Sequence, residues 1–494
     1  MRTFFIALFC ISMFGCQQEI VQKPNVLFIA VDDLRPELGC YGNTQIKSPN
    51  IDKLASEGLV FRRAYCQQSI CMASRASLMS GLRPDTMLIY NCESLEQDVP
   101  GILTLNKHFE NNGYKVWASG KIYHHGVDRK IQFGENHHNP ETQQIGRGYL
   151  SEEAIKIVDE YDVWYRENRN QAGGGRGPAF ESPVVPDNAY HDGKMTDMAI
   201  AQLSQWKDGK EPFFMAVGYK KPHLPFNAPK KYWDLYSANE IKQADNMFPP
   251  ENASQYFNYN FGELRNYYGI PKGRENFNDE LNRKLKHGYY ACVSYIDAQI
   301  GRLLDGLKEN GLDENTIIIL WGDHGWKLGE HNMWCKHTQF EIDNHVPLLI
   351  KVPGQNSVGV KSDAFVEYVD IYPSLCELAD IELPVHLQGT SFVSLIEDPN
   401  KNWKKGAISY WPIGRGDPDK VVMGFTIKTD RYRYTEWIKT STGELMARDL
   451  FDHQTDPDEN VSIANNPENE ELMKALSQLL ERGKGWRKIA SELN

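Results

Sequence analysis

The chain has 494 residues, of which 41% are hydrophobic and 24% are charged, and its formal net charge is -12. This composition is typical of a folded globular protein, long enough for one large core and a smaller appended unit. The acidic balance argues against a protein that binds nucleic acid or anionic membranes, because both need a basic surface. If the substrate is nevertheless an anion, we expect the positive charge to be concentrated in a pocket.

The N-terminus has the pattern of a secretory signal peptide, which we predict at residues 1–16. Arg2 precedes an apolar run from Phe4 to Phe14 that is too short to span a bilayer permanently. Cys16, preceded by glycine and followed by two glutamines, resembles the lipid-bearing residue of a bacterial lipoprotein. We therefore expect export to the periplasm or to the outer membrane of a bacterium, with a lipid anchor as the only membrane attachment.

From about residue 25 short apolar runs alternate with amphipathic stretches. Buried strands are predicted at 26–31, 114–119, 213–218 and 316–322, and helices at 49–58, 104–113, 197–206 and 284–311. Strands that alternate with helices indicate a mostly parallel sheet covered by helices on both faces. The sequence therefore predicts an α/β fold, in which functional groups gather at the carboxyl ends of the strands.

Three regions depart from this alternation. Residues 126–190 are rich in Gly, Asn, His and Pro, and residues 236–278 are rich in Asn, Tyr and Pro. We expect both to be irregular insertions that wall a substrate pocket. After residue 401 the short alternating segments typical of antiparallel strands are followed by an amphipathic helix. We therefore predict a catalytic domain at 22–400 and a smaller α+β subdomain at 401–494.

Charged residues follow each of the four predicted strands. In chain order they are Asp32 and Asp33; Lys121, His124 and His125; Lys220, Lys221 and His223; and Asp323 and His324. A single Asp after a strand is usually a helix cap, but four charged strand ends on one sheet edge predict a functional site. The three carboxylates are hard oxygen ligands that suit calcium or magnesium, whereas the His324 nitrogen is unusual for calcium.

Cys71 precedes a short predicted helix from Met72 to Met79, and so lies at a helix N-terminus, where backbone N–H groups favour an anion. Taken alone, a cysteine in this place is more often an ordinary buried thiol. The segment C-M-A-S-R, continued by SLMSGLRP, resembles the signature C-x-(P/A)-S-R of the type I sulfatase family. In that family the cysteine is oxidised after translation to formylglycine (3-oxoalanine).

The resemblance extends from about residue 25 to the C-terminus and is strongest to the iduronate-2-sulfatase branch. It is carried by the blocks NVLFIAVDDLRPELGCYG, ASGKIYHHG, FFMAVGYKKPHLPF, YYACVSYIDAQIGRLLDGL, WGDHGWKLGEHNMWCKHTQFE and YRYTEW. It implies an alkaline-phosphatase-like α/β/α sandwich with a C-terminal α+β subdomain that holds an antiparallel sheet. It also implies hydrolysis of sulfate monoesters on sulfated carbohydrate, such as oligosaccharides from ulvan, carrageenan or glycosaminoglycan, or a 2-O-sulfated uronate.

The resemblance also assigns roles to single residues. It implies a calcium site formed by Asp32, Asp33, Asp323, His324 and the modified Cys71. It implies that the catalytic groups around the sulfate and the leaving-group oxygen are Arg75, Lys121, His124, His223 and Lys336. Trp326 and His331 are expected to contact the sugar.

Ala73 stands where many sulfatases have proline, and this form resembles the substrates of the radical-dependent, oxygen-independent maturase of bacteria. We therefore expect that maturase as a partner.

Two other readings remain open at this point. One is a phosphate or phosphonate monoester hydrolase of the same superfamily, and the other is a catalytically silent sugar-binding protein. The blocks GKIYHHG and KPHLPF argue against the first, and the complete set of predicted catalytic residues argues against the second. Turnover of sulfated and phosphorylated aryl esters distinguishes the two enzymes, and sugar binding without turnover would support the binding protein.

Overall fold

The computed structural model describes residues 23–87, 94–414 and 417–483, so the predicted signal peptide and Cys16 lie outside the described residues. Within these ranges, no helix combines the length and the apolar character needed to cross a membrane.

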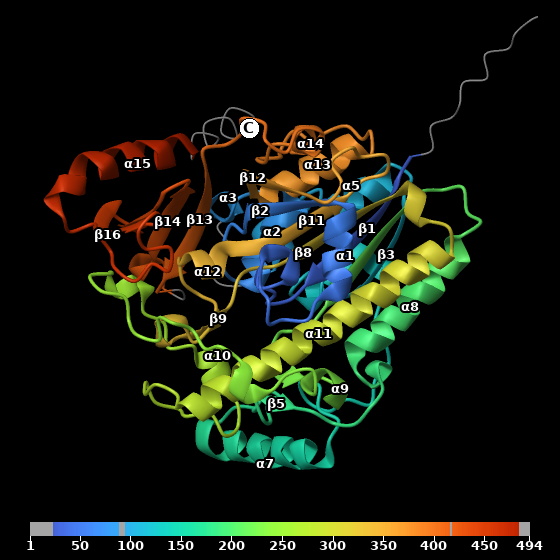
Figure 1. Ribbon diagram of the computed structural model, residues 1–494, viewed down its shortest axis with the longest axis horizontal. Helices are drawn as coiled ribbons and strands as arrows, with labels where there is room; N and C mark the ends of the chain where they lie inside the picture. Colours follow the sequence, from blue (N-terminus) through green and yellow to red (C-terminus); the bar gives the residue numbers. More distant parts are fainter. Residues whose placement is uncertain (1–22, 88–93, 415–416, 484–494) are drawn as a thin grey trace, which may run out of the picture.

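An eight-stranded sheet forms the centre of the molecule (Figure 1). Its strands, in spatial order, are β12 (Val360–Glu367), β2 (Leu59–Tyr65), β11 (His345–Lys351), β8 (Thr316–Gly322), β1 (Asn25–Val31), β6 (Phe213–Tyr219), β3 (Lys115–Gly120) and β4 (His137–His138). β11 runs antiparallel to both of its neighbours, whereas the other neighbouring strands pair in parallel. The mostly parallel sheet predicted from the sequence is therefore confirmed, and its four predicted strands are β1, β3, β6 and β8.

The centre of the sheet is buried on both faces. All seven residues of β1 are buried, and the Phe28 ring packs against Phe214 of β6 and Trp321 of β8 at centroid distances of 5.6 and 5.4 Å. A strand enclosed on both faces reads as a continuous apolar run, which explains the VLFIAV segment.

Helices cover both faces of this sheet (Figure 1). On one face α1 (Pro49–Glu57), α8 (His191–Trp206) and α11 (Asp279–Glu309) pack together, and on the other face α2 (Cys71–Ser80), α5 (Leu105–Asn111) and α13 (Ile371–Leu378) pack together. The α/β/α sandwich is thus confirmed. The short elements are α3 (Pro84–Met87), α4 (Leu95–Asp98), α6 (Gly126–Phe133), β5 (Phe180–Glu181), β7 (Phe226–Asn227), α9 (Lys230–Trp233), α10 (Gly262–Arg265), β9 (Lys327–Leu328), β10 (Trp334–Cys335), α12 (Glu341–Asn344) and α14 (Val393–Glu397).

The insertion at 126–190 is less irregular than its composition indicates. It contains α7 (Glu152–Arg169), an 18-residue helix in which Ala154, Val158 and Tyr161 are buried along one face. The Ser151 side chain accepts a hydrogen bond from the backbone N–H of Ala154 and caps the helix. The expectation of an irregular segment was wrong for these residues, because the surrounding Gly, Asn and Pro conceal an amphipathic repeat and its cap.

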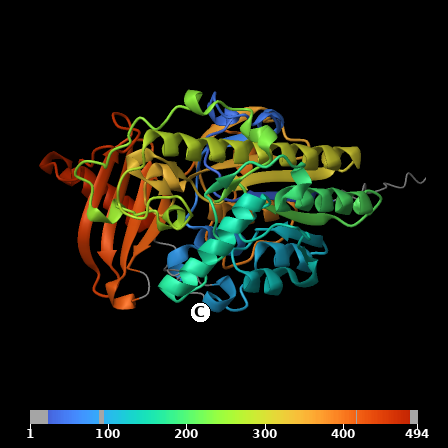
Figure 2. The same cartoon turned by 90° about the horizontal axis from the view of Figure 1, so that it is seen from below.

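A second, four-stranded antiparallel sheet stands at one end of the molecule (Figures 1 and 2). Its order is β13 (Gly406–Ile413), β14 (Val422–Thr429), β15 (Tyr432–Lys439) and β16 (Glu444–Asp452). The amphipathic helix α15 (Glu470–Gly483) packs on it through Met473, Leu476 and Leu480. The antiparallel C-terminal sheet and its helix therefore agree with the α+β pattern read from the sequence, while the domain boundary near residue 400 stays a prediction.

Candidate active site

Four neighbouring parallel strands end at one edge of the large sheet. In the order β8, β1, β6 and β3, they lead to Asp323-His324, Asp32-Asp33, the segment 220–223 and the segment 121–124. Parallel strands carry their carboxyl ends to the same edge, so segments far apart in the chain meet here. The backbone N–H of Asp33 donates to Oδ1 of Asp323 at 2.9 Å, which joins two of these strand ends directly.

Cys71 is the first residue of α2, which begins beside this edge. Its Sγ lies 3.2 Å from Nε2 of His324 and 3.9 Å from Oδ1 of Asp33. Burial raises the pKa of the Cys71 thiol well above its usual value. The unmodified thiol is therefore protonated at neutral pH and is a weak nucleophile, because the thiolate is the reactive form.

Potential metal ligands surround Cys71. Nε2 of His324 lies 3.3 Å from Oδ1 of Asp33 and 3.5 Å from Oδ1 of Asp323. Two groups have ligand atoms that all lie within 4.8 Å of one another, namely Asp33, Cys71, Asp323 and His324, and Asp32, Asp33, Cys71 and His223. Burial raises the pKa of the Asp33 carboxyl, a penalty that a bound cation offsets by stabilising the carboxylate. A buried set of carboxylates thus fits a hard divalent cation.

Two cations hold the carboxylate of Asp32 and connect it to Asp323. Arg75 donates from Nη2 to Oδ1 of Asp32 and from Nε to Oδ2 of Asp323, both at 3.0 Å. Nζ of Lys121 lies 2.6 Å from Oδ2 of Asp32. Burial by itself would raise the pKa of Asp32, but Lys121 and Arg75 hold that pKa well below its usual value. These residues, which the sequence places on four separate segments, form one buried ionic network.

A third cation belongs to a second network, which includes a residue that the sequence analysis did not identify. Nζ of Lys336 lies 3.1 Å from Oδ1 of Asp33 and 2.8 Å from Oε2 of Glu263. Oε1 of the same glutamate lies 2.9 Å from Nε2 of His223, whose Nδ1 lies 2.6 Å from the carbonyl oxygen of Leu224. Glu263 lies in the insertion at 236–278, and no strand end or motif points to it in the sequence.

His124 has the environment of a neutral imidazole. Burial, followed by repulsion from Lys121 and His125, lowers the pKa of His124 to about 2. Its Nδ1 is buried and has no hydrogen-bond partner among the described residues. A neutral imidazole with an unused nitrogen can form a hydrogen bond with a bound group.

Four of these residues, Asp32, Lys121, His124 and His223, line a cavity of about 360 Å³ that we call the cationic cavity. Its lining consists of Asp32, Lys121, His124, Arg129, Thr142, Gln144, Gly146, Arg147, Gly148, Tyr190, His191, Asp192, Lys220, Lys221, His223, Leu224 and Tyr295. Arg129 and the segment from Thr142 to Gly148 come from the insertion at 126–190. This insertion therefore forms part of the cavity wall, as expected, whereas the insertion at 236–278 contributes no lining residue. Five lysine and arginine side chains line the cavity.

The two residues expected to contact the sugar lie away from this cavity. Trp326 is completely buried, and its ring lies under the ammonium group of Lys336 at 4.7 Å. The ring of His331 is buried and stacks on Phe340 with 4.3 Å between centroids.

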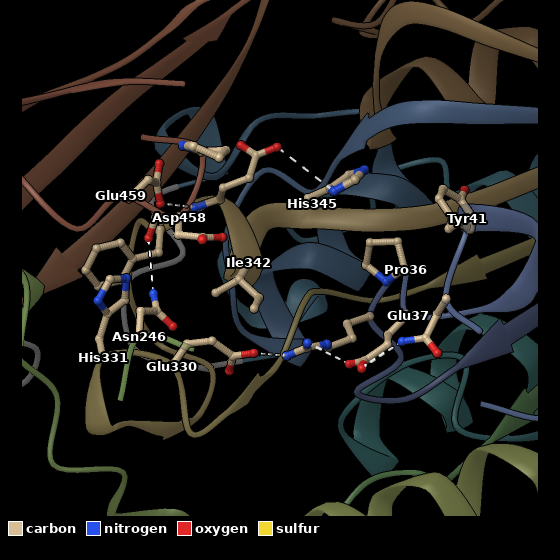
Figure 3. Close-up of a pocket in the computed structure, with 15 residues that line it drawn as sticks. Pro36, Glu37, Tyr41, Asn246, Glu330, His331, Ile342, His345, Asp458 and Glu459 are labelled. Atoms are coloured by element: carbon tan, nitrogen blue, oxygen red, sulfur yellow. Dashed lines mark hydrogen bonds and ion pairs between the residues drawn. The ribbon is translucent and has the colours of Figure 1, made fainter. Parts of the chain in front are cut away.

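His331 lines a different cavity, of about 410 Å³, whose lining includes Glu37, Glu330, Glu341, Asp458 and Glu459 (Figure 3). We call this second space the acidic cavity. The structure thus places His331 in the acidic cavity, and it places Trp326 beneath Lys336, which contacts Asp33.

Comparisons with known proteins agree with this geometry. Residues 24–381 match the family model described as sulfatase, and residues 329–485 match the C-terminal model of N-sulphoglucosamine sulphohydrolase. Iduronate 2-sulfatase of Homo sapiens is 31% identical over 535 residues, which cover 92% of this chain and 93% of that protein. A sulfatase of Formosa agariphila is 30% identical over 510 residues, which cover 97% and 92%.

Among solved structures, the phosphonate monoester hydrolase of Agrobacterium radiobacter superposes with a TM-score of 0.71 at 21% identity. The superposition covers 94% of this chain and 96% of that one. At this identity the likeness concerns the fold alone.

Proposed function

We propose, from the premise that this chain belongs to the sulfatase family and is a sulfuric ester hydrolase, that it removes sulfate from sulfated oligosaccharides. The observation that carries the proposal is the position of Cys71. Within the C-M-A-S-R segment it begins α2, and its sulfur lies between Asp33 and His324 at the carboxyl edge of the sheet. A 2-O-sulfated uronate is the substrate suggested by the relative that acts on iduronate 2-sulfate.

Position 71 acts, in this proposal, as formylglycine rather than as cysteine. The buried and protonated thiol is unsuited to attack by itself, which supports a modified side chain. The hydrated aldehyde supplies one hydroxyl as nucleophile and a second hydroxyl whose deprotonation releases sulfate. Ala73 supports maturation by the radical-dependent bacterial maturase, which the host must provide.

The residues that would hold calcium are Asp32, Asp33, Asp323, His324 and the modified residue 71. When bound there, the cation neutralises charge on the sulfate and lowers the pKa of the attacking hydroxyl. The three carboxylates fit this ion, because they are buried and their oxygens converge on the nucleophile position.

The protein's own cations neutralise the sulfate. Anionic oxygens of a sulfate ester repel a nucleophile, so Arg75, Lys121 and Lys336 stabilise the charge that develops in the transition state. From the family pattern we assign His124, which lines the cationic cavity beside Asp32 and Lys121, to proton exchange at residue 71. His223 has a hydrogen-bond acceptor at each ring nitrogen, so both nitrogens can carry hydrogen, and we assign it or Lys336 as the proton donor to the departing alcohol.

Turnover by the matured enzyme tests this function. After co-expression with the anaerobic maturase, 4-nitrophenyl sulfate should be hydrolysed much faster than 4-nitrophenyl phosphate or phenylphosphonate esters. Preference for the phosphorus esters would instead support the phosphonate hydrolase alternative, whose fold is similar. A panel of defined sulfated oligosaccharides would then identify the sugar and the sulfate position.

The cationic cavity supports removal of sulfate from chain ends. A pocket accepts a terminal sugar and excludes units in the middle of a chain, and an acidic surface repels a long polyanion. We therefore expect faster sulfate release per sulfate from polymer that a lyase has digested than from intact polymer. Equal initial rates would contradict this mode of action.

Export and lipidation complete the proposal. Residues 1–16 support a signal peptide and Cys16 a lipid anchor, which would place the enzyme in the periplasm or at the outer membrane. Metabolic labelling with a fatty acid should mark the wild-type protein and not a Cys16→Ser variant.

A further inference from the structure

The cationic cavity holds more positive charge than the reaction at residue 71 uses. Its lining includes five lysine and arginine residues and two aspartates; these are Lys121, Arg129, Arg147, Lys220 and Lys221, with Asp32 and Asp192. Lys121 pairs with Asp32, and Nζ of Lys221 donates to the carbonyl oxygens of His223 and Pro225. Nε of Arg147 donates to the carbonyl oxygen of Gly174 at 3.0 Å. These contacts account for three of the five cations.

The acid nearest to Lys220 already has partners of its own. The carboxylate of Asp192 is buried and accepts the backbone N–H groups of Lys220 at 3.1 Å and Lys221 at 2.9 Å. Its Oδ1 also lies 3.3 Å from Nδ1 of His191. Asp192 therefore holds the loop after β6 in place, and it makes no ion pair with the ammonium group of Lys220.

Arg129 and Lys220 are the cations without a partner. Within residues 23–87, 94–414 and 417–483, neither side chain makes a hydrogen bond or an ion pair. Such side chains are common on open surfaces, where water solvates them, but these two face one cavity. Arg129 is partly buried, and burial followed by repulsion from Arg75 lowers its pKa. The Lys220 side chain is exposed at the cavity; desolvation, opposed in part by Asp192 and reinforced by Arg129, lowers its pKa. An anion that contacts both side chains would relieve the repulsion between them.

This pair is separate from the groups that face the sulfate to be removed. Arg75, Lys121 and Lys336 each contact one of the buried aspartates around residue 71. Arg129 lies on α6 and Lys220 follows β6, and neither contacts those aspartates. The two cations thus line the outer part of the same cavity.

We propose that Arg129 and Lys220 form a second anion subsite, which binds a carboxylate or a second sulfate on the sugar whose sulfate is removed. The inference rests on the proposed sulfatase function and narrows it to sugars that carry two anionic groups. A charge-assisted hydrogen bond from such a pair contributes about tenfold or more to affinity.

Equilibrium binding to the chain produced without maturase tests the subsite, because that chain keeps Cys71 and cannot turn the ligands over. Three methyl glycosides serve as probes: glucoside 2-sulfate, glucuronoside 2-sulfate and glucoside 2,6-disulfate. They share the 2-sulfate and differ only at carbon 6, which carries a hydroxyl, a carboxylate or a sulfate. We expect the wild type to bind one or both dianionic probes about tenfold more tightly than the monoanionic probe.

Substitution separates the subsite from general electrostatics. In Arg129→Ala and in Lys220→Ala the preference for the dianionic probe should fall at least about threefold, and in the double variant it should disappear. Lys130→Ala removes an exposed neighbour on α6 that does not line the cavity, and should keep the wild-type preference. The dianionic probe whose affinity falls in the double variant shows whether the bound anion is a carboxylate or a sulfate.

Equal affinity of the wild type for all three probes would overturn the second subsite, as would an unchanged preference in the double variant. Hydrolysis of 4-nitrophenyl sulfate by the matured wild type is measured separately. A matured enzyme that fails to release sulfate contradicts the proposed function, whereas an active enzyme without the dianion preference contradicts the subsite alone.

Discussion

The segment that follows β1 reaches both cavities: Asp32 lines the cationic cavity, and Arg35 and Glu37 line the acidic cavity. The charges of the two cavities are nevertheless arranged differently. In the acidic cavity most of the acids pair with an arginine that two of them share. Arg35 pairs with Glu37 and Glu330 (Figure 3). Arg433 pairs with Glu341 and Glu459. Arg433 lies on β15 and Glu341 begins α12, so this pair joins the C-terminal sheet to the helix that precedes β11 of the large sheet.

Around residue 71 the carboxylates instead converge on one atom. Both groups of potential metal ligands found among the described residues include Cys71 and Asp33, and neither includes a residue that lines the acidic cavity. The comparison teaches that the number of charged residues does not identify the reactive site. Convergence on a nucleophile identifies that site, whereas ion pairs between an arginine and the acids of other segments hold the fold together.

The largest expected effect comes from replacing the residue on which the carboxylates converge. Cys71→Ala should reduce sulfate release by about 10⁴-fold or more, as is typical when a nucleophile is removed. Peptide mass spectrometry of the matured wild type should show an aldehyde at position 71. Cys376→Ala, which removes another buried thiol, should retain activity. A fully active enzyme with an unmodified cysteine would refute the assignment.

A metal ligand and an acid of the acidic cavity should respond differently to the same change. Asp323→Asn should lower activity and bound calcium together, by at least about 100-fold in activity, since even indirect support of a metal site contributes 10- to 100-fold. Asp458→Asn should leave both within a few fold. Metal analysis decides the point, and full occupancy by zinc would overturn the calcium assignment.

Breaking the pairing in the acidic cavity should reduce stability. Arg433→Ala leaves Glu341 and Glu459 without their buried cation and should lower the free energy of unfolding by about 3–5 kcal/mol in urea titrations. Arg431→Ala breaks a more exposed pair with Asp452 and should change it by about 1 kcal/mol or less. Similar losses in the two variants would contradict the structural role of the pair.

The same pairing should make stability depend on acid pH. Burial would raise the pKa of Glu341, but Arg433 lowers it to about 2, below the usual 4.5. A lowered pKa in the folded state stabilises the protein above pH 4.5, and this contribution is lost as the pH falls through 2. The expected loss is about 2–3 kcal/mol. Glu341→Gln should flatten the decline of the urea midpoint over this range, and an unchanged slope would argue against the pair.

Much of the fold could be predicted because its signals are local. The apolar run 26–31 and the amphipathic stretch 284–311 became β1 and α11, with ends within a few residues of the prediction. The helix α7 was missed because its flanking residues dominate the composition of the insertion. Its signal, the cap at Ser151 and the repeat of buried residues, was nevertheless present in the sequence.

The sequence by itself determined the family, through the segment around Cys71. It also identified the charged residues at four strand ends, because each of them follows its strand directly in the chain. Only the tertiary structure decided that Glu263 connects His223 to Lys336, that Trp326 lies beneath Lys336, and that His331 faces the acidic cavity. The pairing of Glu263 with His223 depends on how an insertion folds back over the sheet edge. Such long-range contacts arise from packing between segments that no local pattern connects.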